Sequence, residues 1–79
     1  MFVSISTRSS IADGSTASAI DEEALIRTNN GETDGHLITT FDENNILTYT
    51  RFWTSLEAAQ NWVIFVEQFG STGTAKEIA

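Results

Sequence analysis

One amphipathic stretch, TSLEAAQNWVIFVEQFG at residues 54–70, constrains the fold of this chain more than any other. On a helical wheel that advances about 100° per residue, its apolar side chains share one arc of roughly 180°. Thr54 and Glu57 have the spacing of a capping box, and Gly70 suits the positive φ found just after a helix. The stretch therefore predicts a helix that packs one face on another layer. The apolar arc consists of Leu56, Ala59, Trp62, Val63, Phe65, Val66 and Phe69.

The 79 residues predict a single domain over residues 1–79. Folding of so short a chain buries only about 60 to 65% of the surface that the unfolded chain exposes, so additional stabilisation is needed. The chain has no Cys for a disulfide, and one His without Cys does not make a structural zinc site. We therefore expect no metal and no cofactor, and we expect oligomerisation to supply the stability.

Four basic and eleven acidic side chains give a net charge of −7. This charge repels nucleic-acid phosphates and anionic lipid surfaces, so we expect neither nucleic acid nor a membrane as a partner. Solubility is the ordinary role of such charge. An acidic mimic of DNA is the alternative, but the acids are dispersed except at residues 21–23. Because no basic region precedes an apolar run and no apolar span reaches 18 residues, we expect a cytoplasmic or virus-encoded intracellular protein.

Three segments have residue patterns that are typical of β-strands. In residues 1–8, Val3, Ile5 and Thr7 oppose Phe2, Ser4 and Ser6. The runs 36–42 and 46–53 flank a polar hairpin loop at residues 42–45, whose oxygen atoms lack the spacing of a calcium loop. Residues 74–78 fit a short edge strand or a frayed end, and the edge strand is favoured.

A short helix is predicted between the first two strands, at residues 19–28. Ser18 and Asp21 repeat the capping-box spacing, and Arg27 suits the negative end of the helix dipole. Asn29, Asn30 and Gly31 follow as a helix stop. The resulting order is that of a ferredoxin-like α+β fold, β-α-β-β-α with a short last strand, in which one helical layer covers an antiparallel sheet.

The two strands of the predicted hairpin carry large apolar groups on both faces. A sheet with water on one side should be apolar on one face only, and 79 residues hold no second layer to cover the other face. We therefore expect a homodimer in which a second copy covers that face. The sequence leaves open whether a different protein is also a partner.

The passage ILTYTRFWTSLEAAQNWVIFV at residues 46–66 resembles the aromatic strand, Ser-x-Glu-Ala segment and Trp-bearing helix of the dimeric α+β barrel group. The best-known members of that group are the antibiotic biosynthesis monooxygenase-like proteins. The resemblance implies a ferredoxin-like fold in which two sheets pack face to face. Such a barrel would account for strands that are apolar on both sides.

Catalytic candidates are few. His36 is the only side chain whose ordinary pKa lies near neutrality, and no Ser, Cys or second His is spaced to form a triad with it. Members of the resembled group that degrade haem or oxidise polyketides use Asn, Trp and His in a cavity, but His36, Trp53 and Asn61 do not align with those positions, so the resemblance carries no catalytic role over to this chain. His36 and Asn61 are the catalytic candidates that the sequence offers. The candidate ligand or interface residues are Phe2, Ile38, Leu47, Tyr49 and Trp53.

Two classes of function fit the sequence. The favoured one is a small acidic homodimeric binding or assembly module without a catalytic site. The alternative is a small cofactor-independent monooxygenase-like or small-molecule-binding enzyme. A cavity of about 300 Å³ or more into which His36 or Asn61 reaches would favour the enzyme.

Overall fold

The computed structural model describes residues 1–9 and 14–78. Within them the elements follow the predicted β-α-β-β-α-β order of a ferredoxin-like α+β fold. They are β1 (Phe2–Ser9), α1 (Gly14–Asn29), β2 (Thr33–Phe41), β3 (Ile46–Trp53), α2 (Leu56–Glu67) and β4 (Thr72–Glu77).

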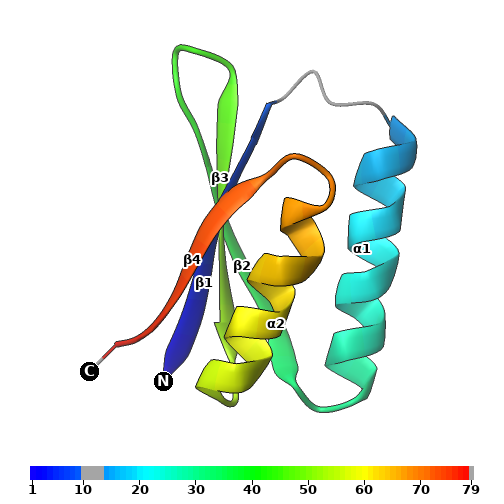
Figure 1. Cartoon of the computed structure of the whole chain (residues 1–79), viewed down its shortest axis with the longest axis vertical. Coiled ribbons are helices and arrows are strands. Elements are labelled where there is room, and N and C mark those ends of the chain that lie inside the picture. Colours follow the sequence, from blue (N-terminus) through cyan, green and yellow to red (C-terminus); the bar gives the residue numbers. More distant parts are fainter. Residues whose placement is uncertain (10–13, 79) are drawn as a thin grey trace.

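The four strands form one antiparallel sheet in the order β2-β3-β1-β4. Both helices lie on the same side of this sheet, and among the described residues no helix covers the other side (Figure 1). The register between β1 and β3 places Ser4 opposite Arg51 and Ser6 opposite Tyr49. The predicted sheet with one helical layer is confirmed.

The core lies between the sheet and the helices. Trp62 of α2 is 1% exposed, and its ring centroid lies 5.4 Å from that of Trp53 in β3. Ile20 and Ala24 of α1 complete the cluster. The centre of the predicted apolar arc of α2 is thus buried. Its ends are not, since Leu56 and Phe69 are exposed.

Helix α2 begins one residue later than the capping box indicated. Ser55, and not Thr54, is the N-cap: its backbone is extended, and its hydroxyl accepts a hydrogen bond of 3.1 Å from the backbone N–H of Ala58. Thr54 instead donates its hydroxyl hydrogen to the carbonyl of Glu32, at 3.2 Å. Gly70 has a φ of 88°, as predicted for the residue after the helix.

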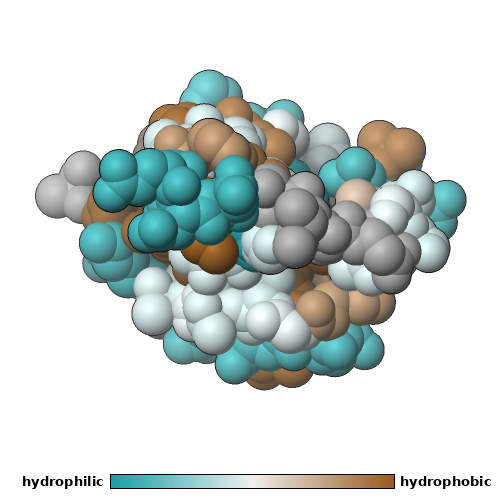
Figure 2. Space-filling view, turned by 90° about the horizontal axis from the view of Figure 1, so that it is seen from above, coloured by the Kyte–Doolittle hydropathy of each residue, from teal (hydrophilic) through white to brown (hydrophobic). Residues whose placement is uncertain are grey.

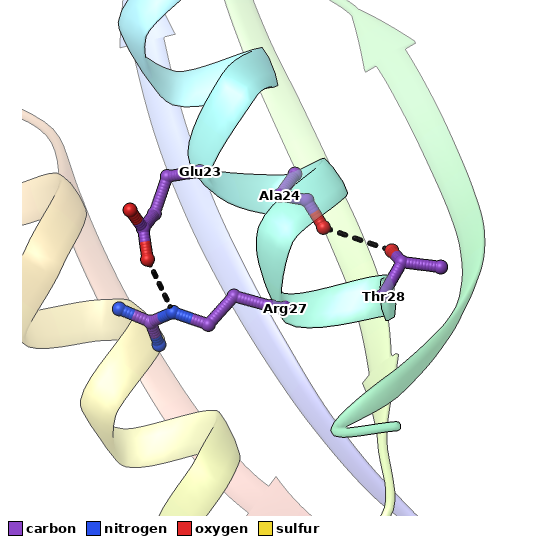
Figure 3. Close-up of polar contacts among 4 residues, drawn as sticks. All are labelled: Glu23, Ala24, Arg27 and Thr28. Atoms are coloured by element: carbon purple, nitrogen blue, oxygen red, sulfur yellow. Dashed lines mark hydrogen bonds and ion pairs between the residues drawn. The ribbon is translucent and has the colours of Figure 1, made fainter. Parts of the chain in front are cut away.

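Helix α1 is longer than predicted. It covers Gly14–Asn29 rather than residues 19–28, so Ser18 lies inside the helix and is not its cap. Near its end, Arg27 Nε donates to Glu23 Oε2 at 2.7 Å, and its guanidinium lies 5.7 Å from the ring centroids of Trp62 and Phe65. Figure 3 shows this side chain directed toward α2. The contacts of Arg27 therefore link the two helices.

The strand ends also differ from the prediction. β2 begins at Thr33 rather than at residue 36, and its register shifts between Thr33 and Leu37. The last strand exists and lies at the sheet edge, but it covers residues 72–77 rather than 74–78. The hairpin loop is a plain turn, in which Asp42 Oδ1 accepts from the backbone N–H groups of Asn44 and Ile46.

In the described part of the chain, neither helix combines the length and apolar character that crossing a membrane requires.

Candidate functional site

The pleat of the sheet sorts its side chains into two sets, because successive residues of a strand point to opposite faces. Trp53 and Ser4 mark the side that faces the helices, since Trp53 is in the core and its Nε1 donates to Ser4 Oγ. The side without a helix is called the open face here. It consists of Val3, Ile5, Thr7, Asp34, His36, Ile38, Thr40, Ile46, Thr48, Thr50, Phe52, Thr72, Thr74 and Lys76.

The open face is largely made of β-branched and apolar side chains. Val3 is buried beside its cross-strand neighbours Phe52 and Lys76. Ile5 and Phe52 are half-buried, whereas Ile38 is 45% exposed. This face therefore presents apolar surface to solvent in a single copy of the chain.

The predicted ligand or interface residues divide between the two faces. Phe2, Leu47, Tyr49 and Trp53 lie on the helix side of the sheet, where Phe2 and Trp53 belong to the core or pack against it. Of these candidates, only Ile38 lies on the open face.

The two catalytic candidates lie apart. His36 is exposed on the open face, with its ring centroid 5.0 Å from that of Phe52. Asn61 is exposed on α2, which covers the other side of the sheet. The fold does not bring these two side chains into one site.

A small cavity of about 20 Å³ lies between the sheet and the helices. It has room for about one water molecule. Its lining comes from β1, β3, both helices and the residue before β4: Ser6, Arg8, Ile20, Asp21, Tyr49, Arg51, Trp62, Val66 and Ser71. Sequence reasoning named Tyr49 but missed Arg8 and Arg51. The available signal was that Arg8 and Arg51 share strand faces with Ser6 and Tyr49, respectively.

Aromatic rings hold both arginines of the cavity. Arg8 donates to the Tyr49 hydroxyl at 2.6 Å, and its guanidinium carbon lies 4.9 Å from the centroid of the same ring. The Arg51 guanidinium lies 4.9 Å from the Trp62 ring centroid. Cation–π contacts of this kind fix the position of a guanidinium without neutralising it. The cavity is thus lined by two oriented cations.

Arg51 is 8% exposed, which is unusual for a charged side chain. Burial lowers the pKa of its guanidinium, because removal from water disfavours the charged form. Electrostatic interaction with Asp21, and with Tyr49, raises the pKa of Arg51, whereas the charge of Arg8 adds to the lowering. Asp21 itself is exposed, on the helix α1 that forms one wall.

Figure 2 shows the end of the molecule at which β1 ends and α1 begins. Hydrophilic residues cover much of this surface, and apolar residues appear among them as separate spots. Within residues 1–9 and 14–78, no group of three or more His, Cys, Asp or Glu side chains is placed to hold a metal ion.

No protein-family model and no curated protein matches the sequence. Among solved structures, the chain is similar to a candidate antibiotic biosynthesis monooxygenase from Deinococcus radiodurans, with 19% identity, a TM-score of 0.44 and coverage of 100% of this chain and 93% of the other. It is also similar to a protein from Agrobacterium tumefaciens, with 16% identity, a TM-score of 0.49 and coverage of 100% and 94%. At 16 to 19% identity, these similarities concern the fold alone.

Proposed function

We propose that the protein is a homodimeric binding or assembly module whose two copies pair through the open face of the sheet, each copy being one domain over residues 1–79. The observation that carries this proposal is the distribution of charge. The chain has a net charge of −7, yet β1, β3 and β4 place no Asp or Glu on the open face, and β2 has only Asp34, at its irregular start. Like charges oppose the approach of two copies, so a face with few acidic residues is one through which self-association costs little.

Apolar surface supports the same choice. Ile5, Ile38 and Phe52 lie on three strands of the open face and are all partly exposed in a single copy. Their burial against a second copy would remove apolar area from water, at about 25 cal/mol per Å². A two-fold axis lets one self-complementary surface serve both copies.

An interface variant tests this pairing. We expect Ile38→Asp to dissociate the dimer, because the change places a carboxylate in an apolar interface. The monomer should still fold, since Ile38 is 45% exposed. Sedimentation equilibrium at micromolar concentration should give a dimer mass for the wild type and a monomer mass for this variant.

The matched control is Ile64→Asp, which makes the same chemical change at a residue of α2 that is 66% exposed. This variant should remain dimeric. A monomeric wild type would overturn the proposal, and so would dissociation by Ile64→Asp with Ile38→Asp still dimeric.

The enzyme alternative finds less support in the geometry. A site for an organic substrate has a volume of about 300 Å³ or more, whereas the cavity between sheet and helices has about 20 Å³. A wider depression of about 500 Å³ between α2 and β4 exceeds the volume that such a site requires but is open to solvent, and it is lined by Gln60, Val63, Ile64, Gly73, Thr74 and Ala75. Neither His36 nor Asn61 lines either space. The module is therefore the better-supported function.

A further inference from the structure

Two of the four basic side chains of this acidic protein converge on one small cavity. Arg8 comes from the end of β1 and Arg51 from β3, and the strand register sets them on the same side of the sheet. Two like charges in one partly enclosed space repel each other, so their convergence is unfavourable unless a negative charge accompanies them.

The described residues supply that negative charge only in part. Within residues 1–9 and 14–78 the ion pair that forms is Arg27–Glu23, neither of which lines the cavity, and no carboxylate pairs with Arg51. Asp21 lines the cavity and favours the charged form of Arg51, but it does not reach ion-pair distance. Among the described residues that line the cavity, two cations and one carboxylate leave one positive charge.

We propose that this cavity binds the carboxylate group of a small monovalent organic acid, held between Arg8 and Arg51. A guanidinium donates two parallel hydrogen bonds to the two oxygens of a carboxylate, a match that a spherical anion cannot make. Tyr49 and Trp62 hold the two guanidiniums in place before a ligand arrives. This pre-organisation reduces the entropy lost on binding.

The size of the cavity limits what enters it. With about 20 Å³ of space, it admits one oxygen of the carboxylate, and the other oxygen would lie at the mouth of the cavity. The rest of the acid would project outward on the side of Asp21, which is exposed. A single negative charge on the ligand matches the single positive charge that the lining leaves.

Titration with acetate and formate tests the site directly. The side-chain Nε–Hε signals of the arginines are followed by NMR at constant ionic strength, with chloride as the comparison anion. As acetate or formate is added, the signals of Arg8 and Arg51 should shift and then reach a plateau when the site is saturated. The signal of Arg27, which lies outside the cavity lining, should not move. Shifts that increase without saturation, or equal saturable binding of chloride, would overturn the proposal.

Two variants with opposite expected effects sharpen the test. Arg8→Gln should weaken acetate binding at least tenfold, because one of the two cationic donors is lost. Asp21→Asn should tighten it, because the competing carboxylate is removed from an exposed position that folding tolerates. Glu43→Gln makes the same change in net charge in the hairpin loop and should leave the affinity unchanged. Unaltered binding in Arg8→Gln, or equal tightening by Asp21→Asn and Glu43→Gln, would contradict the proposed site. None of these measurements depends on the sheet-to-sheet dimer.

Discussion

The hydroxyl of Ser4 and the indole N–H of Trp53 form a buried hydrogen-bonded pair at the edge of the apolar cluster. Their atoms are 2.9 Å apart, and both residues are buried. A buried donor or acceptor that loses its partner costs about 1 to 3 kcal/mol, whereas loss of both partners together costs less. This pair therefore helps to fix the register between β1 and β3.

A double-mutant cycle measures the coupling of this pair. Ser4→Ala and Trp53→Phe should each lower the free energy of unfolding by about 1 to 3 kcal/mol. The double variant should cost less than their sum, with a coupling energy of about 0.5 kcal/mol or more in urea denaturation. Thr7 and Thr72 provide the control, since their hydroxyls lie 2.8 Å apart across β1 and β4 but on an exposed surface. Strict additivity at Ser4 and Trp53 would show that the bond is not important for stability.

At the scale of a single element, the start of α2 depends on Ser55. We expect Ser55→Ala to destabilise the protein by about 1 kcal/mol, because the N–H of Ala58 loses its acceptor. Thr54→Ala should cost less, since Thr54 is exposed and its backbone N–H keeps a bond of 3.0 Å to Glu32. Thermal unfolding of both variants shows which of the two residues caps the helix. A larger loss of stability for Thr54→Ala than for Ser55→Ala would indicate that Thr54 is the N-cap, as the sequence suggested.

The elements differ in how far the sequence determined them. α2 was predicted closely, because its apolar spacing, its cap region and Gly70 agree with one another. The start of α1 was missed, because residues 14–18 are small and polar and carry no apolar period, while Ser18 and Asp21 imitate a cap further along. Only packing of Ile20 and Ala24 on the sheet reveals which face of this helix is buried.

The cavity could not be predicted from the sequence for a different reason. Arg8 and Arg51 are 43 residues apart, and only the pairing of β1 with β3 sets them on one side of the sheet. Alternation did place Arg51 with Tyr49 and Trp53. The alternation could not show that the face with Arg51 is the one that the helices cover, because both faces of the strand contain aromatic residues.

At the scale of the whole molecule, the two sides of the sheet have different chemistry. The helix side carries the core and a small cationic cavity, while the open face consists mainly of threonine and apolar residues, with Asp34 as the one acidic residue, at the irregular start of β2. A chain of 79 residues buries too little surface to be strongly stable alone. Pairing through the open face would add buried apolar surface where few acidic residues oppose it.

The most direct test of this pairing is an isotope-filtered NOE measurement on an equal mixture of labelled and unlabelled protein. It detects contacts between copies and assigns them to residues. We predict intermolecular NOEs from Ile5, Ile38 and Phe52, all on the open face. Intermolecular NOEs that arise instead from Ile64 on α2, or the absence of any NOE between copies, would contradict pairing through the open face.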